Sequence, residues 1–356
     1  MDTGWFAPLL ESHMNAHPAM EAIDVVKLAF QAVLGCGHLL ADESIVMARI
    51  ETEMASVTPD GEMPLFESIG PDYIRVNLSR WKAENLPVAW LARMMLLSDS
   101  ATEYKTDRKS VIAVLKSVFD ERTDALPDNI SRLCDRLMSE PDWLPSHSAA
   151  YNQAYQPSYR VVSWKFTPLM PVLQAVSDAL HHHGRILMCI DGPCGSGKST
   201  LAGVLQRIFD AAVIPMDDFF TPHAQKTPER LAIPAGNADI ERIVAECVTP
   251  WQKHQPIQYA PYLCMKDAFG PPIMVEDKPV TIIEGSYSLH SEIAKSAAVK
   301  VFLSIDRQEQ LQRLARRDGT EMLKMFETRW IPLEEAYHQA FQLPDEHCIV
   351  VNQQGV

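Results

Sequence analysis

The chain has no excess of basic residues. Its 356 residues include 32 lysines and arginines against 46 aspartates and glutamates, which gives a formal net charge of −14. A surface that binds nucleic acid or an anionic membrane needs clustered positive charge. We therefore expect neither a nucleic-acid partner nor a membrane partner, although a local basic pocket stays open as an alternative.

Long apolar runs are also missing. The longest, Val88 to Leu97, contains Arg93 and is about half of the roughly 20 residues that a membrane-spanning helix needs. Met1 to Leu10 has neither a basic start nor a long apolar core, so we expect no secretory signal. The sequence therefore predicts a cytoplasmic protein.

Closely spaced cysteine pairs are absent as well. The chain has seven cysteines, an odd number, and no C-x-x-C motif, which favours reduced thiols over disulfides. Cys194 lies in the glycine-rich segment described below. Either a following helix N-terminus lowers its pKa and makes it sensitive to oxidation, or the residue only fills a loop position.

The chain is long enough for two domains, because 356 residues exceed the size at which one hydrophobic core usually stops growing. Apolar residues at helical spacing predict a mainly α-helical N-terminal domain over residues 1–140, of unknown role. A Pro- and aromatic-rich linker is predicted over 141–171 and a second domain over 172–356. The N-terminal helices are expected at Met20 to Val33, Glu43 to Met54, Pro87 to Ser98 and Ser110 to Phe119.

The segment from residue 186 to residue 208 is the most informative part of the chain. An apolar run, Ile186 to Ile190, predicts a buried strand, and helical spacing follows from Leu201 to Ile208. Between them lies the pattern G-x-x-x-x-G-K-S/T of a phosphate-binding loop, whose backbone NH groups, helix N-terminus and lysine hold nucleotide phosphates. We expect ATP here, with the Ser199 hydroxyl on Mg2+. The loop residues are Gly192, Pro193, Cys194, Gly195, Ser196, Gly197, Lys198, Ser199 and Thr200.

Beyond the loop, short β-rich runs alternate with helical ones. This alternation predicts an α/β fold in which helices flank a parallel sheet, with a ligand crevice at the carboxyl ends of the strands. Strands are expected at Ala212 to Met216, Val280 to Glu284, Val299 to Ile305 and Cys348 to Val351.

Acidic residues follow two of these predicted strands. In a phosphate-loop kinase, a carboxylate at this edge takes the proton of the acceptor hydroxyl and holds the water shell of the metal. We assign this role to Asp217, with Asp218 as the alternative, and a plain acidic turn or helix cap remains open. Glu284 is then expected to contribute to the Mg2+ site.

A predicted helix after the fourth strand ends in three arginines. Arg316 and Arg317 come three and four residues after Arg313, which predicts that the three arginines lie on one side of the helix. Planar guanidinium groups suit a transferring phosphoryl group. Gly319 would let the segment bend as a lid. We expect Arg313 to contact the nucleotide and Arg316 or Arg317 to act in catalysis, although arginines at a helix C-terminus are also favoured by the helix dipole alone.

Together these motifs make residues 185–352 resemble the uridine kinase and phosphoribulokinase group of phosphate-loop kinases. The matching segments are the loop, Asp217-Asp218-Phe219-Phe220, Glu284-Gly285, and Arg313 to Asp318. The resemblance implies a base role for Asp217, a magnesium role for Ser199 and Glu284, and a lid role for Arg316 or Arg317.

The resemblance is weaker on the acceptor side. Asn237 and Asp239 match the acceptor segment of the group, although either could be only a helix cap. Ala260 stands where nucleoside kinases have an acid, and the lid is shortened to residues 319–324. The other candidate acceptor contacts are Tyr259, Tyr262, His223 and Arg230.

We therefore predict an ATP- and Mg2+-dependent kinase that phosphorylates a hydroxyl of a small metabolite, with a nucleoside as the leading acceptor. The alternative acceptor is another sugar, a vitamin or a polyol. The sequence leaves open whether the protein forms a homo-oligomer. A nucleotide-dependent switch acting through the N-terminal domain is a further alternative. Against it, the guanine-binding motif N-K-x-D is missing.

The N-terminal half loosely resembles an uncharacterised helical region found in some bacterial uridine kinase-like proteins. Its polar residues could form a metal or catalytic cluster and an anion site, but solvated helix faces explain them better. The cluster candidates are His17, Asp24, His38, Asp42 and Glu51, and the anion-site candidates are Arg75 and Arg80. His181 to His183 are expected to end a helix rather than bind a metal.

Overall fold

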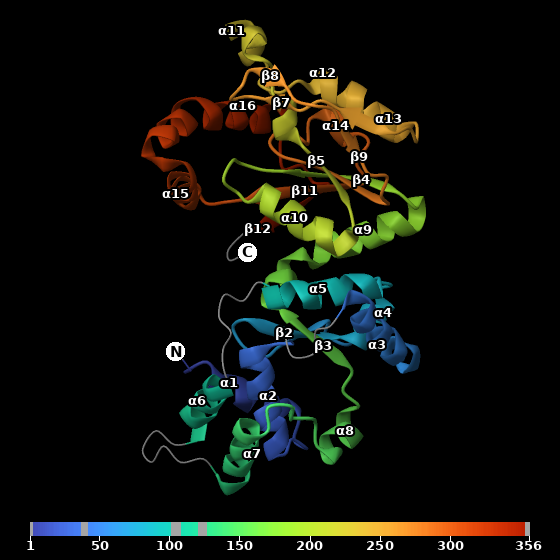
Figure 1. Ribbon diagram of the computed structural model, residues 1–356, viewed down its shortest axis with the longest axis vertical. Coiled ribbons are helices and arrows are strands. Elements are labelled where there is room, and N and C mark those ends of the chain that lie inside the picture. The colour runs from blue at the N-terminus through green and yellow to red at the C-terminus, as the bar shows by residue number, and fades with distance from the viewer. Residues whose placement is uncertain (1–2, 37–41, 101–107, 120–126, 353–356) are drawn as a thin grey trace. The chain divides into compact units, whose positions relative to one another are not determined.

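The computed structural model describes residues 3–36, 42–100, 108–119 and 127–352 (Figure 1). The chain divides into two units, Met1–Thr167 and Pro168–Val356. None of the described helices is long and apolar enough to cross a membrane.

The first unit is mainly helical, as expected. The four predicted helices are present, and their ends lie within two residues of the predicted ones. The apolar residues that predict these helices are the ones they bury. In α2, for example, Val26, Leu28 and Ala29 face the core and are less than 1% exposed. The helices are α1 (Phe6–Ala16), α2 (Ala22–Leu34), α3 (Glu43–Ser56), α4 (Leu78–Ala83), α5 (Val88–Ser100), α6 (Arg108–Phe119), α7 (Asp128–Ser139) and α8 (Ala149–Tyr155).

This unit also contains a three-stranded antiparallel sheet that the sequence analysis does not predict. Its order is β1 (Phe66–Ser68), β2 (Tyr73–Asn77) and β3 (Tyr159–Ser163). The central strand β2 is buried over most of its length, so it needs a partner on each side. β3 supplies the second partner from a distant part of the sequence, with Arg75 opposite Val161.

Residues 141–171, the predicted linker, contain α8 and β3 in this structure, and β3 pairs with the sheet of the first unit. The two units divide between Thr167 and Pro168. The prolines and aromatic residues of this stretch therefore belong largely to the core and edges of the first unit. Tyr151, for example, is 3% exposed.

The second unit has the predicted parallel sheet flanked by helices. The strand order is β12-β11-β4-β10-β5, and every neighbouring pair is parallel. α9 and α10 cover one face, whereas α12, α13 and α14 cover the other (Figure 1). The strands are β4 (Ile186–Asp191), β5 (Ala212–Pro215), β10 (Val280–Glu284), β11 (Val299–Ser304) and β12 (Cys348–Asn352).

Several helices of this unit are short, since α11, α12, α13 and α14 have four residues each. Two π-helical turns, Val244–Val248 and Phe326–Trp330, continue α12 and α15. The α-helices are α9 (Met170–His183), α10 (Lys198–Phe209), α11 (Pro228–Leu231), α12 (Ile240–Ile243), α13 (Thr249–Gln252), α14 (Ser291–Ala294), α15 (Arg307–Met325) and α16 (Ile331–Phe341).

Two small antiparallel pairs complete the unit. They are β6 (Ile257–Tyr259) with β9 (Ile273–Val275), and β7 (Tyr262–Leu263) with β8 (Ala268–Phe269). The short 3-10 helices are Trp164–Leu169, Met216–Phe219 and His223–Gln225.

The sheet register brings the acidic residues and the glycine-rich loop predicted from sequence to one edge of the sheet. Glu284 at the end of β10 lies opposite Ile190 of β4 and Pro215 of β5. The loop after β4 and the acidic turn after β5 therefore leave the sheet beside Glu284. This edge is formed by the carboxyl ends of parallel strands, where α/β proteins bind ligands.

Candidate active site

The loop after β4 has the backbone of a phosphate-binding loop. Gly192, Gly195 and Gly197 all have positive φ angles, and Gly197 is the N-cap of α10. A Cβ atom on Gly192 would lie 2.4 Å from the backbone oxygen of Leu303, so no other residue fits there. The N-terminus of α10 consequently points into the site with its positive dipole end.

Lys198 lies across this loop. Its Nζ atom donates to the Gly192 oxygen at 2.7 Å and to the Pro193 oxygen at 3.0 Å. The side chain is only 8% exposed, so the charge is held at the mouth of the loop, where a phosphate group can replace the carbonyl contacts.

A cavity of about 680 Å³ opens at this edge of the sheet. It combines loop residues with the acids of β5 and β10 and with side chains of α15 and α16. Of the residues predicted from sequence, it is lined by Cys194, Gly195, Gly197, Lys198, Ser199, Thr200, Asp217, His223, Asn237, Glu284, Arg313 and Arg317. Gly192, Pro193 and Ser196 shape the loop without lining the cavity.

One acidic side chain of the cavity contacts Ser199, and a second lies close enough to the first to affect its pKa. The Ser199 hydroxyl donates to Oε2 of Glu284 at 3.2 Å. Burial raises the pKa of Asp217, an effect that Lys198 opposes, and burial together with the charge of Asp217 raises the pKa of Glu284. A hydroxyl and two crowded carboxylates form an all-oxygen donor set that fits Mg2+, and the ion would relieve their mutual repulsion.

Asp217 and Asp218 have different surroundings. Asp217 lines the cavity, whereas Asp218 does not. Oδ2 of Asp218 accepts a hydrogen bond from the Tyr259 hydroxyl at 2.9 Å. Asp217 is therefore the carboxylate that an acceptor in the cavity can reach.

The three arginines of α15 do not act as one group. Arg313 and Arg317 are four residues apart, lie on one side of the helix and line the cavity. Arg316 is exposed and does not line it. Beyond them Gly319 has φ 83° and ψ 168°, so α15 is interrupted at the predicted bend of the lid.

Four of the predicted acceptor contacts do not line the cavity, because each is bonded to other groups of the protein: Arg230, Asp239, Tyr259 and Tyr262. Arg230 donates to the oxygens of Gly236 and Ala238 and pairs with Glu241. Asp239 caps α12 by accepting from the Arg242 backbone NH at 3.1 Å. The structure thus favours the helix-cap interpretation of Asp239.

The two tyrosines are also engaged elsewhere. Tyr259 is 4% exposed and donates to Asp218. Tyr262 is 3% exposed, and its hydroxyl contacts Asp267 and accepts from the His223 backbone NH. Of the acceptor candidates, only His223 and Asn237 remain at the cavity.

Sequence reasoning missed Glu334 of α16. This residue is 6% exposed, and its Oε2 accepts from the backbone NH of Cys194 at 2.8 Å while its Oε1 accepts from the Ser286 hydroxyl at 2.6 Å. It thereby occupies an amide of the phosphate loop. No local signal marks it, because Glu334 lies in the first turn of a helix, where an acid is ordinary. Phe326 and Trp330 of the neighbouring π-helical turn complete the cavity wall and were likewise missed.

The environment of Cys194 decides between its two interpretations. Burial raises the pKa of the thiol, and the charge of Glu334 raises it further. The surroundings therefore favour the second interpretation over a pKa lowered by the helix N-terminus, because desolvation and a nearby carboxylate oppose the dipole. Cys194 fills a loop position as a thiol.

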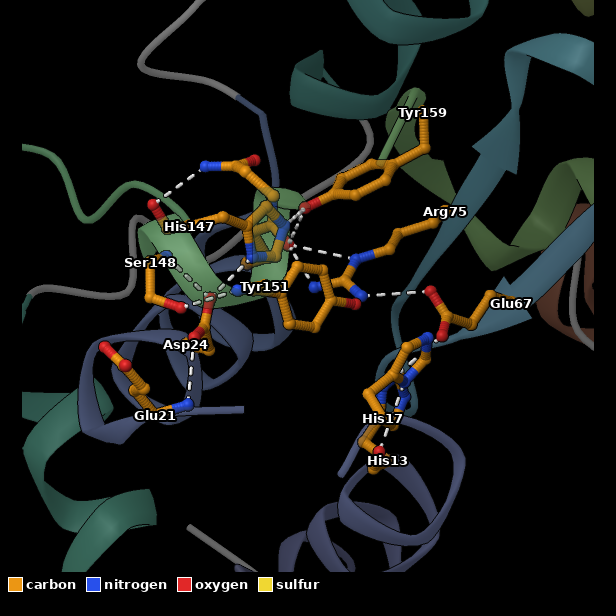
Figure 2. Close-up of polar contacts among 12 residues, drawn as sticks. His13, His17, Glu21, Asp24, Glu67, Arg75, His147, Ser148, Tyr151 and Tyr159 are labelled. Carbon is orange, nitrogen blue, oxygen red and sulfur yellow. Dashed lines mark hydrogen bonds and ion pairs between the residues drawn. The ribbon is translucent and has the colours of Figure 1, made fainter. Parts of the chain in front are cut away.

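The polar residues of the first unit are not all on solvated faces. Asp24 and Arg75 are 1% and 3% exposed. Oδ1 of Asp24 accepts from Nδ1 of His147 at 2.8 Å (Figure 2). Arg75 donates to Gln31 and pairs with Glu67 at 2.9 Å. The interpretation as solvated faces is wrong for these two residues, because each has partners from distant segments that compensate its burial.

The other candidates of this unit separate from one another. Asp42 caps α3 through the Ser44 backbone NH, Glu51 is exposed, and Arg80 pairs with Glu84. His38 lies outside the described residues. His17 lies beside His13 and Glu67 rather than beside Asp24.

No protein-family model matches the sequence, and no curated protein matches it. Many solved structures resemble the chain, among them the following three. A candidate fructose transport system kinase from Silicibacter sp. TM1040 is 21% identical with a TM-score of 0.41, over 48% of this chain and 94% of the other. A protein described as a possible uridine kinase from Bacillus stearothermophilus is 18% identical with a TM-score of 0.38, over 51% and 100%.

The third is a candidate P-loop-containing kinase with a circular permutation, from Saccharomyces cerevisiae. It is 11% identical to this chain with a TM-score of 0.41, over 52% of this chain and 98% of the other. Each likeness covers about half of the chain.

Proposed function

We propose that the second unit is a cytoplasmic ATP- and Mg2+-dependent kinase that phosphorylates a hydroxyl group of a small metabolite. The observation that carries the proposal is the meeting of Lys198, Ser199, Asp217 and Glu284 in one cavity with two lid arginines. A cavity of this size holds a nucleotide tail and a small acceptor.

The side chains divide the work of phosphoryl transfer among them. ATP supplies the phosphoryl group, and Mg2+ neutralises its charge when bound. Lys198 and the loop amides hold the phosphates, and Arg313 and Arg317 face the charge that develops during transfer. Asp217 accepts the proton of the acceptor hydroxyl, and burial holds its pKa above the usual range, which makes it a better base.

A nucleoside is the leading acceptor class, and another hydroxylated metabolite is the second candidate. Two observations favour the second. Tyr259 is tied to Asp218 and turned from the cavity, and the backbone oxygen of Ala260 accepts from Arg242 at 2.6 Å. Neither residue of this segment is free to hold a ribose or a base.

A metabolite-library screen tests the proposal. The full chain is incubated with ATP, Mg2+ and pools of nucleosides, sugars, vitamins and polyols, and phosphorylated products are detected by mass. We expect one acceptor class to give product, with kcat/KM for uridine below about 10⁵ M⁻¹s⁻¹. A higher value for uridine would show that a nucleoside is the natural acceptor. No product from any pool would contradict the kinase proposal.

A further inference from the structure

Three metal-ligating side chains meet in the first unit, and none of them lines the active-site cavity. His13 and His17 are one helical turn apart at the end of α1, and Glu67 lies in β1. One ligand atom from each lies within 4.8 Å of the others. Figure 2 shows the two imidazole rings gathered beneath the Glu67 carboxylate.

Hydrogen bonds to backbone carbonyls fix the tautomers of both histidines. Nε2 of His13 lies 2.9 Å from the Ser68 oxygen, and Nδ1 of His17 lies 3.1 Å from the His13 oxygen. A carbonyl oxygen only accepts, so each of these nitrogens carries the proton. Nδ1 of His13 and Nε2 of His17 are left with lone pairs when the rings are neutral. Metal-binding histidines in proteins are held in the same way.

His13 presents its lone pair to a second acceptor. Nδ1 of His13 lies 3.4 Å from Oε1 of Glu67. Two acceptors facing each other repel unless a cation lies between them. Ligand atoms at about 2.0 to 2.1 Å from a tetrahedral ion are about 3.4 Å apart, which is the separation found here.

Glu67 is held in place by its other oxygen. Oε2 accepts from Nη1 of Arg75 at 2.9 Å, and the guanidinium group of Arg75 also donates to Oε1 of Gln31 at 2.8 Å. Arg75 is 3% exposed. A buried, doubly bonded arginine thus orients the carboxylate and leaves Oε1 directed at His13, as outer hydrogen bonds do around metal-binding carboxylates.

We propose that His13, His17 and Glu67 bind one divalent transition-metal ion, Zn2+ by their donor set, with a coordination position left open. Two imidazole nitrogens and one carboxylate are a donor set of open zinc sites. Ligand atoms of one tetrahedral ion are about 3.4 Å apart, so a pair at the 4.8 Å limit closes by about 1.4 Å when the ion binds. The site is independent of the proposed kinase activity.

Calorimetric titration of the untagged full chain with Zn2+, after treatment with a chelator, tests this site. We expect one strong site per chain in the wild type, weakened on the order of 100-fold or more in His17→Gln and in Glu67→Gln. Both variants should fold. His17 is partly exposed, and in Glu67→Gln the side-chain amide oxygen can still accept the hydrogen bond from Arg75. Circular dichroism confirms that they fold.

The matched control removes the other histidine cluster. His181, His182 and His183 are exposed at the end of α9 and could bind Zn2+ adventitiously. Replacement of all three by alanine should leave the strong site unchanged. The proposal is overturned if wild-type protein shows no strong site, if a folded His17→Gln or Glu67→Gln variant binds as wild type does, or if the alanine triple variant abolishes binding.

Discussion

At the scale of single residues, the chemistry depends on which of two adjacent aspartates reaches the cavity. Asp217 lines it, and Asp218 is bonded to Tyr259. Asp217→Asn should lower kcat on the order of 10² to 10⁴ fold, because the base is lost, while ATP affinity changes only a few fold. Steady-state kinetics and ATP titration measure the two quantities.

Asp218→Asn is the control for that experiment. It changes the neighbouring carboxylate without touching the cavity wall, so kcat should stay within about 10-fold of wild type. The assignment fails if Asp218→Asn causes the large loss and Asp217→Asn does not.

Glu334 competes with phosphate for an amide of the loop. Its carboxylate accepts from the Cys194 NH and adds negative charge to the site where we propose that ATP binds. Glu334→Gln should therefore tighten ATP binding by about 5-fold or more, since a like charge nearby costs about 1 kcal/mol even with the full screening of water and more at a buried position. Isothermal titration with ATP measures the change.

Glu335→Gln provides the matched comparison, because Glu335 is exposed and pairs with Arg307. Its ATP affinity should equal that of wild type within about 2-fold. Weaker ATP binding in Glu334→Gln would mean that the carboxylate supports the loop instead of competing with phosphate.

Sequence predicted the residues of the site better than their partners. Lys198, Asp217 and Glu284 follow from motifs whose spacing is fixed by the strand ends. The hydrogen bonds that engage Arg230, Tyr259 and Tyr262 away from the cavity could not be predicted, because they depend on how the loops around them fold. The contact of Glu334 with the phosphate loop could not be predicted either, because it depends on how α16 packs against a loop 140 residues earlier in the chain.

At the scale of elements, long periodic segments were predictable and short pairings were not. The four predicted helices of the first unit and the strand Val280–Glu284 agree with expectation, since each carries its own apolar pattern. β1 has only three residues and β3 pairs from more than 80 residues beyond β2, so no local pattern shows the sheet. The π-helical turns likewise depend on tertiary packing.

The bend of α15 at Gly319 is the element most open to test. Its φ and ψ lie in a region that only glycine adopts readily, and alanine there costs on the order of 1 to 3 kcal/mol. Because the segment is exposed, it can avoid this cost by rearranging, so the melting temperature of Gly319→Ala should change little. The rearranged lid should lower kcat/KM by up to about 100-fold.

Gly203→Ala is the control, since Gly203 lies within α10 and a Cβ atom there meets nothing within 4 Å. That variant should keep full activity and gain up to about 1 kcal/mol of stability. Equal kcat/KM for Gly319→Ala and wild type would show that the bend is not used in catalysis.

At the scale of the whole molecule, the chain divides between Thr167 and Pro168. Each unit has its own sheet and its own buried core, so residues 168–356 should fold alone and bind ATP within about 3-fold of the full chain. Thermal unfolding and ATP titration of this fragment measure both. A fragment that is insoluble or lacks a cooperative transition would show that the two units need each other to fold.

The central claim is phosphoryl transfer from ATP at the loop after β4, and Lys198→Ala tests it most directly. The Lys198 ammonium group lies across that loop, and its removal deletes the positive charge that would contact the phosphates of ATP. Turnover is measured as ADP release together with mass detection of the phosphorylated acceptor, with circular dichroism to confirm folding. We predict a loss of at least about 100-fold. A folded Lys198→Ala protein with turnover close to wild type would contradict the account.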